Sequence, residues 1–285
     1  MMIRQPRWTV QMQAAGRWSA RGACAEAALR LAQQAILSVA DRRALDALSI
    51  TIVEEVPPHR GLGSGTQLAL AVAAGVRRLA GMPPGTAGEL ADMVHRGQRS
   101  AVGSHGFVHG GLIWESGRLP GQSLGRLVER VAVPDGWRIL LVAPRGPAGL
   151  SGQSEREAFR RLPPVSPRTT SELIDLAEKE ILPAARAADC RRFGEAVYLY
   201  GRLAGECFAS VQHGAYASPQ VADCVAALRQ LGVAGVGQSS WGPTVFACVE
   251  GSEEARWAAM QLKRKLRMAE YDIRITSPDN IGATV

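Results

Sequence analysis

Hydrophobic positions near the start of the chain follow first a helical and then an alternating spacing. Residues 21–40 are rich in alanine and carry one apolar stripe, which predicts a buried helix. Residues 48–53 alternate hydrophobic and polar side chains, which predicts a half-buried strand. A second apolar stripe after residue 67 predicts another helix, which ends near Gly81. The two helical stripes are Ala28, Leu31, Ala35 and Val39, and Leu68, Val72, Val76 and Leu79.

The rest of the chain continues this mixture of helical and extended patterns. Residues 144–170 are rich in Pro, Gly, Ser and Arg, which is typical of a long connection between domains. We therefore expect an α+β protein with two domains, 1–150 and 151–285. Further helices are expected at 89–99, 171–188, 191–210, 220–231 and 252–268, and further strands at 112–114, 138–143, 244–249 and 271–275.

Composition narrows the class of protein. The 285 residues are 46% hydrophobic and 21% charged, which is typical of globular proteins. No stretch approaches the roughly 18 apolar residues that a membrane span needs, and the first twenty residues contain no apolar block, so we expect neither a membrane protein nor a secreted precursor. The five cysteines form no CxxC pair, which predicts free thiols in a reducing cytoplasm.

The formal net charge of +7 comes almost entirely from arginine. Arginine suits bidentate contacts to phosphate and carboxylate, although codon usage explains the same excess. The sequence contains no basic run with interleaved aromatic residues. We therefore expect small anionic ligands and no nucleic-acid partner.

The strongest local signal is a glycine-rich turn at residues 57–67, between a predicted strand and a predicted helix. Glycine lets the backbone approach a ligand closely, and the N-terminus of a helix favours an anion. Arg60 adds charge, and the spacing matches neither a Walker A loop nor GxGxxG. The turn is predicted to bind phosphate; a plain strand-to-helix turn is the alternative. Its phosphate-binding candidates are Gly61, Gly63, Ser64, Gly65, Thr66 and Gln67.

Three further segments are candidates for chemistry. His105 and His109 stand among glycines that favour a loop, where they would act as acid–base or phosphate-contacting groups or simply pack. As metal ligands they lack a clear third partner, and Arg96 and Arg99 upstream suit an anionic substrate. The loop 235–243 contributes Gln238, Ser239, Ser240 and Trp241, of which Trp241 would stack on a ring or cap the core. Asp279 and Asn280 would bind substrate or form a turn.

These segments together resemble a known family. Residues 57–68 read PPHRGLGSGTQL, which resembles the phosphate loop of the GHMP kinase superfamily, and the GLGSGTQ form is most like the β-ribofuranosylaminobenzene 5′-phosphate synthases (β-RFAP synthases). The glycine-flanked segment 103–111, the sequence GQSSWGP at 237–243 and the Pro-Asp-Asn at 278–280 strengthen this resemblance. It covers about four-fifths of the chain. It implies a two-lobed fold, with an N-terminal mixed sheet and a C-terminal ferredoxin-like sandwich.

The resemblance also implies a reaction. Ribose phosphate would pass from phosphoribosyl pyrophosphate to 4-aminobenzoate or 4-hydroxybenzoate, with loss of carbon dioxide and pyrophosphate, in tetrahydromethanopterin biosynthesis. Magnesium would assist, and the protein would be a homodimer. Arg60 and the loop amides would take the pyrophosphate, while Arg99, His105 or His109 would hold the benzoate or move a proton.

Two departures from the family pattern keep other functions open. The start of the chain, MMIRQPRW, matches the family's first motif poorly and is expected to enter a helix by about residue 21, which would shorten the N-terminal sheet. A non-catalytic paralogue that binds a ligand or partner is therefore one alternative. An ATP-dependent small-molecule kinase is another, although no Asp or Glu lies between Ala101 and Trp114 to serve as its base. No metal ligands are assigned, because Glu54, Glu55, Glu115 and Asp279 are equally plausible.

Overall fold

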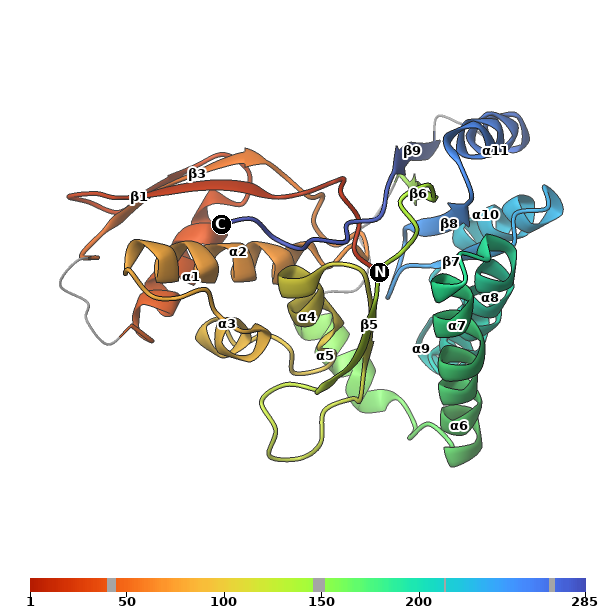
Figure 1. Cartoon of the computed structure of the whole chain (residues 1–285), viewed down its shortest axis with the longest axis horizontal. Helices are drawn as coiled ribbons and strands as arrows, with labels where there is room; N and C mark the ends of the chain where they lie inside the picture. Colours follow the sequence, from red (N-terminus) through yellow and green to blue (C-terminus); the bar gives the residue numbers. More distant parts are fainter. Residues whose placement is uncertain (40–44, 146–151, 213, 267–269) are drawn as a thin grey trace. The chain divides into compact units, whose positions relative to one another are not determined.

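The computed structural model describes residues 1–39, 45–145, 152–212, 214–266 and 270–285 (Figure 1). These residues form two compact units. Unit 1 comprises residues 1–57, 63–130 and 279–285, and unit 2 comprises residues 58–62 and 131–278. The division passes through the glycine-rich turn. The expected domain boundary at 150/151 falls on residues 146–151, outside the described residues, and stays a prediction.

Unit 1 contains a mixed three-stranded sheet in the order β1-β3-β2. The central strand β3 (Leu48–Glu54) pairs antiparallel with β1 (Thr9–Ala14) and parallel with β2 (Ser19–Arg21). Its inward residues Leu48, Ile50 and Ile52 are buried because the hydrophobic alternation places them on one face. The predicted strand at 48–53 is thus confirmed. The sequence patterns did not predict β1 and β2, and the first helix begins at Ala25 rather than near residue 21.

Two helices share the core of unit 1 with this sheet. They are α1 (Ala25–Ile36) and α2 (Ser64–Leu79), and both were expected from their apolar stripes. The α2 residues Leu68, Val72 and Val76 are buried, as the helical spacing predicts. The remaining elements of unit 1 are α3 (Ala87–Met93), α4 (Val102–His109) and a two-stranded sheet of β4 (Leu112–Glu115) and β5 (Leu127–Val131). The helix expected at 89–99 is therefore shorter and begins earlier.

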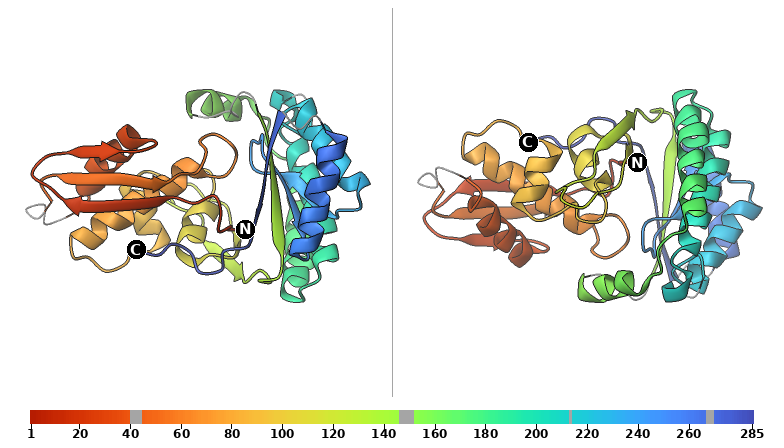
Figure 2. Two further views of the ribbon diagram at one scale, coloured as in Figure 1. Left: turned by 90° about the horizontal axis from the view of Figure 1, so that it is seen from above. Right: turned by 90° about the horizontal axis from the view of Figure 1, so that it is seen from below.

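Unit 2 contains an antiparallel sheet in the order β7-β8-β6-β9. Its elements follow the chain as strand, helices, two strands, helix and strand, which is the split βαβ arrangement of ferredoxin-like folds. Figure 2 shows the main helices of the unit on one face of the sheet. The strands are β6 (Arg138–Pro144), β7 (Gly235–Gln238), β8 (Val245–Val249) and β9 (Tyr271–Thr276). The chief helices are α8 (Cys190–Glu206), α10 (Pro219–Gln230) and α11 (Ser252–Lys265).

A run of shorter helices precedes α8. It consists of α5 (Gly152–Arg161), α6 (Pro167–Asp175), the π-helical segment η1 (Leu176–Ile181) and α7 (Leu182–Arg186), and α9 (Ala209–Gln212) follows α8. The expected helices of the second half are confirmed to within a few residues at their ends. No helix among the described residues has the length and apolarity to cross a membrane.

Candidate functional site

The glycine-rich turn opens helix α2 with a backbone that favours glycine. Gly61 and Gly63 have φ angles of +77° and +67°, in the left-handed region that costs other residues free energy. Gly63 is the N-cap of α2, and its carbonyl accepts hydrogen bonds from the Thr66 and Gln67 amides at 3.0 Å. No side chain caps the helix, and its first turn carries no acidic residue. This N-terminus is therefore suited to an anion.

A second helix begins beside the first turn of α2. Gln67 Nε2 donates to the Gly103 carbonyl at 2.9 Å, and a Cβ on Gly103 would lie 3.3 Å from Thr66 Cγ2. Gly103 stands in the first turn of α4, which also has no side-chain cap. The Arg96 guanidinium lies 3.8 Å from the position of a Cβ on Gly65. Unit 1 thus brings two helix N-termini and a cation together around Gly65, Thr66 and Gln67.

The N-terminal segment supports this turn, although its motif matches the family poorly. Trp8 Nε1 donates to the Ser64 carbonyl at 2.9 Å, and Ser64 itself is buried. The Trp8 ring packs against the core of unit 1, together with Val10 and Met12. The chain before β1 therefore holds the start of α2 in place.

The first half of the turn packs against the loop 235–243 within unit 2. Ser239 Oγ donates to the Gly61 carbonyl at 2.7 Å, and a Cβ on Gly61 would overlap the Ser239 carbonyl oxygen. Arg60 Nη1 donates to the Pro144 carbonyl at the end of β6, at 2.8 Å. Two segments that the sequence singles out separately are thus in direct contact. The Arg60 guanidinium has a structural partner in addition to its predicted role.

The other candidates in the loop 235–243 are tied into local structure. The Gln238 amide accepts from the Ala217 backbone at 2.6 Å and donates to the Ser240 carbonyl at 2.9 Å. Trp241 is half-buried and makes edge-on contacts with Phe159 and Phe208, at ring-centroid distances of 5.0 and 4.8 Å. This aromatic cluster agrees with the packing alternative for Trp241. Ser240 is exposed. The segment expected as loop is a strand, β7, as far as Gln238.

His105 and His109 lie on one face of a helix, and the expectation of a loop is wrong. Their rings are stacked with centroids 6.4 Å apart. His105 is buried, and its Nε2 donates to the Gly125 carbonyl at 2.8 Å. Burial lowers the pKa of His109 below its ordinary value, and the nearby His105 and Arg130 lower it further. His109 is the more exposed member of the pair. Its lowered pKa favours the neutral imidazole, which can accept a proton.

The glycines around the histidines are sites of close approach rather than breaks in the helix. A Cβ on Gly106 would overlap the Met2 side chain, and a Cβ on Gly110 would lie 2.5 Å from the Asn280 backbone. Packing therefore stabilises α4 against the low helix propensity of glycine. Arg99 is exposed and precedes α4 by a few residues.

Asp279 and Asn280 belong to a turn that closes on unit 1. Asp279 Oδ1 accepts from the Ile281 amide at 3.0 Å, and the Asp279 carbonyl accepts from the Gly111 amide at 2.6 Å. The Asn280 carbonyl accepts a hydrogen bond from Arg130. These contacts agree with the turn alternative for Asp279. They also place Arg130, which the motifs do not indicate, between this turn and His109.

Three of the four carboxylates considered for a metal have structural partners: Asp279, described above, Glu54 and Glu115. Glu54 Oε2 accepts from Arg7 Nε at 2.6 Å and also from Thr9, and this lowers the Glu54 pKa. Glu115 accepts from the Ala101 and Gly117 amides, at 3.1 and 2.8 Å. Over the described residues no three metal-ligating side chains gather into one group. These residues do not fit a protein cage for magnesium.

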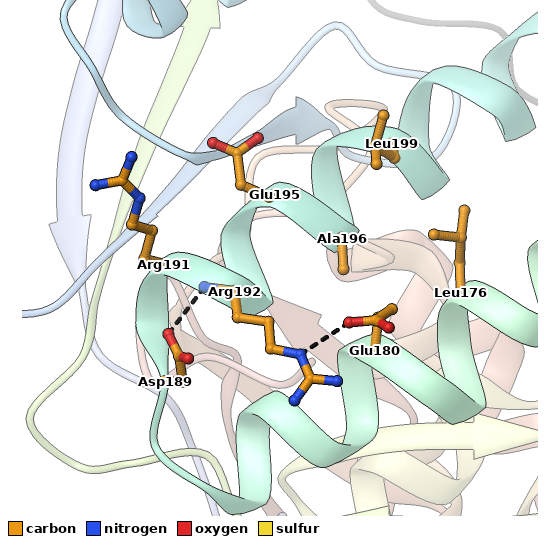
Figure 3. Close-up of a pocket in the computed structure, with 8 residues that line it drawn as sticks. All are labelled: Leu176, Glu180, Asp189, Arg191, Arg192, Glu195, Ala196 and Leu199. Atoms are coloured by element: carbon orange, nitrogen blue, oxygen red, sulfur yellow. Dashed lines mark hydrogen bonds and ion pairs between the residues drawn. The ribbon is translucent and has the colours of Figure 1, made fainter.

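A groove of about 440 Å³ lies elsewhere, between η1 and α8 in unit 2 (Figure 3). Several of its charged groups have structural partners: Arg192 Nε donates to Glu180 Oε2 at 2.8 Å, and Asp189 caps α8 by accepting from the Arg192 amide at 2.9 Å. None of the residues predicted to act on substrate lines it. The lining residues are Leu176, Glu180, Asp189, Arg191, Arg192, Glu195, Ala196 and Leu199.

Similarity to known proteins agrees with this architecture. The model of the GHMP kinases N terminal domain matches residues 25–111, and the GHMP kinases C terminal model matches residues 181–267. The homoserine kinase of Cytophaga hutchinsonii superposes with a TM-score of 0.73 at 16% identity, over 98% of this chain and 89% of that one. The mevalonate pyrophosphate decarboxylase of Streptococcus pyogenes gives 0.68 at 12% identity, over 96% and 84%. These likenesses confirm the two-lobed α+β fold.

Sequence relatives are more specific than the fold. The beta-ribofuranosylphenol 5′-phosphate synthase of Methanothermobacter thermautotrophicus is 30% identical over 244 residues, covering 79% of this chain and 73% of that protein. The enzyme of the same name from Archaeoglobus fulgidus is 30% identical over 228 residues, covering 71% and 65%. Both of these relatives of the chain are named as enzymes. This chain belongs to the GHMP kinase family and, within it, groups with the beta-ribofuranosylphenol 5′-phosphate synthases.

Proposed function

We propose that this protein is a β-RFAP synthase-like transferase. It moves ribose 5-phosphate from magnesium-bound phosphoribosyl pyrophosphate to 4-aminobenzoate or 4-hydroxybenzoate, with release of carbon dioxide and pyrophosphate. The observation that carries the proposal is the uncapped N-terminus of α2, beside the N-terminus of α4 and the Arg96 guanidinium. Similarity to relatives that are named for a ribofuranosyl phosphate product supports the same reaction.

The bond changes define what the protein must do. The bond between the anomeric carbon and pyrophosphate breaks, and the ring carbon that bears the carboxylate attacks the anomeric carbon. The bond from that ring carbon to the carboxylate then breaks and releases carbon dioxide. Negative charge therefore develops on the leaving pyrophosphate, where the Gly65 amide in the first turn of α2 and the Arg96 guanidinium would stabilise it. Positioning of the two substrates supplies the rest of the acceleration.

The remaining candidate residues take roles around this step. Arg99 would hold the benzoate carboxylate, and the exposed imidazole of His109 would accept or return a proton. Arg60 and Ser239 position the first half of the glycine-rich turn through their hydrogen bonds to Pro144 and Gly61. The proposal includes a cytoplasmic homodimer acting in tetrahydromethanopterin biosynthesis, as the family resemblance implies.

Release of labelled carbon dioxide tests the reaction. Protein, magnesium and phosphoribosyl pyrophosphate would be incubated with each carboxyl-labelled acid. We expect release that requires the donor and that falls about 10- to 100-fold in Arg96→Ala, because a charge-assisted hydrogen bond contributes about 1.5–3 kcal/mol. Arg30→Ala removes an exposed arginine that pairs with Glu26 on α1, so it is the matched control and should retain full activity.

The same assay separates the alternatives. A folded protein that releases no carbon dioxide from either acid would overturn the proposal. Turnover of magnesium-bound ATP would then identify a kinase, and donor binding without turnover would identify a non-catalytic paralogue. Helix α4 contains no Asp or Glu to serve as a kinase base.

A further inference from the structure

Two cysteine thiols meet in unit 2, away from the loops considered above. Cys190 is the first residue of α8, and Cys248 lies in β8. Both are free thiols, and their side chains are hydrogen-bonded to each other. They are 58 positions apart in the chain, so tertiary packing brings them together.

Close packing of α8 against the sheet explains this contact. A Cβ on Gly194 would lie 2.5 Å from the Gly235 amide nitrogen, so glycine lets α8 approach β7 very closely. Gly235 pairs with Cys248 in the neighbouring strand β8, and its own Cβ would lie 3.2 Å from Cys248 Cβ. Cys190 precedes Gly194 by one helical turn and therefore lies on the same face of α8. The packing of α8 against β7 and β8 therefore places both cysteines on the same side of this contact.

The two thiols differ in accessibility. Cys190 is half-buried at the first position of α8. Cys248 is buried, and the Cys190 hydrogen bond together with burial raises its pKa. An oxidant from solvent would therefore meet Cys190 first, and Cys248 is the nearest thiol to respond.

We propose that Cys190 and Cys248 form a redox modification site, a reversible disulfide that joins α8 to β8. The oxidant is a low-molecular-weight disulfide. The Cys190 thiolate attacks one of its sulfurs, forms a mixed disulfide and expels one small thiolate. The Cys248 thiolate then attacks the Cys190 sulfur and expels the second. Two protein thiols are oxidised, one small disulfide is reduced to two thiols, and the charges and protons balance.

This bridge would act on a functional part of unit 2. Strand β8 follows directly after the loop 235–243, whose Ser239 contacts Gly61. A covalent link would fix the N-terminus of α8 to that strand and would restrict unfolding of the sheet. Oxidation would therefore stiffen the support of the glycine-rich turn.

Oxidised glutathione provides the test. After treatment of the folded protein, the intact mass, corrected for any glutathione bound to the exposed Cys24, should fall by the mass of two hydrogens. Peptide mapping should link Cys190 to Cys248. The melting temperature should rise by roughly 5–10 °C and return on reduction. Cys190→Ser and Cys248→Ala should abolish both changes.

Matched cysteine variants serve as controls. Cys207→Ser removes another half-buried thiol at the end of α8, and Cys224→Ala removes a buried thiol whose pKa burial raises to about 12. Both variants should still form the bridge. A stable glutathione adduct on Cys190, an unchanged mass, or a link that involves Cys24, Cys207 or Cys224 would each overturn the proposal.

Discussion

Gly61 joins two loops that are far apart in the sequence. Its φ angle is +77°, its carbonyl accepts from Ser239 Oγ, and the Ser239 carbonyl fills the space where a Cβ would stand. Gly63 has a similar φ angle of +67°, but among the described residues no other segment comes within 4 Å of its Cβ position. A comparison of substitutions at the two glycines therefore separates two contributions to the free energy of unfolding, that of the backbone conformation and that of close packing.

We expect Gly61→Ala to destabilise the protein by about 2–4 kcal/mol, because it adds a clash to a strained conformation. Gly63→Ala adds the strain alone and should cost about 1–2 kcal/mol. Urea unfolding followed by circular dichroism would measure both. Equal losses in the two variants would show that the Ser239 contact contributes nothing.

His109 makes stability depend on pH. Its pKa is lowered in the folded protein, so between that value and the ordinary value near 6.5 the unfolded chain binds more protons. The contribution of His109 to the free energy of unfolding is therefore fully present above pH 6.5. It is lost as the pH falls through the pKa of His109 in the folded protein. We expect His109→Gln to show a smaller fall in melting temperature between pH 7 and pH 5 than the unsubstituted protein. Identical pH profiles would contradict the assignment.

At the scale of elements, two glycines of helix α8 have opposite effects on stability. Gly194 lies in close contact with Gly235 of β7, whereas no other segment in the part of the chain that the structure describes comes within 4 Å of the Cβ position of Gly201. Glycine at the first position permits packing, and at the second it only lowers helix propensity.

The paired alanine variants should therefore differ in sign. Gly194→Ala forces α8 away from the sheet and should destabilise unit 2 by about 2–4 kcal/mol. Gly201→Ala should stabilise it by up to about 1 kcal/mol, because alanine is the better helix former. Chemical denaturation of both variants tests this, and a stabilised Gly194→Ala would refute the close packing.

Local sequence patterns predicted some elements and missed others for identifiable reasons. The apolar stripes of α1 and α2 and the alternation of β3 were sufficient, since each element buries one face. No strand was predicted at β1, although Trp8, Val10 and Met12 alternate there. The poor match of the segment MMIRQPRW to the family's first motif argued against a strand at this place. Helix α4 was missed because its glycines suggest a loop, and only tertiary packing compensates for them.

At the scale of the whole molecule, the chain returns to its first unit at the end. After β9 of unit 2, residues 279–285 belong to unit 1. There the Ala283 amide donates to the Phe107 carbonyl at 2.7 Å, and Arg130 holds the Asn280 carbonyl. The last seven residues are therefore structural parts of the unit that carries α2 and α4.

Deletion of residues 279–285 should consequently weaken unit 1 and spare unit 2. We expect faster hydrogen–deuterium exchange in α4 and β5, because both lose direct partners, and little change in β6 to β9. Substitution of the exposed Val285 by Ala is the control and should leave exchange in both units unchanged. Loss of protection confined to unit 2 would be the contrary result.

The sequence by itself determined the α+β class, the glycine-rich turn before α2 and the family of the protein, because these depend on residues close together in the chain. It did not determine which candidates meet. The contact of Gly61 with Ser239, the stacking of His105 and His109 and the turn of Asp279 depend on how distant segments pack. Spacing also left two alternatives open for Trp241, since a buried tryptophan and a ligand-stacking one look alike in sequence. Tertiary structure decided which of these segments meet, because close packing and hydrogen-bond geometry act between neighbours in space, and the roles of these residues toward a ligand stay predictions.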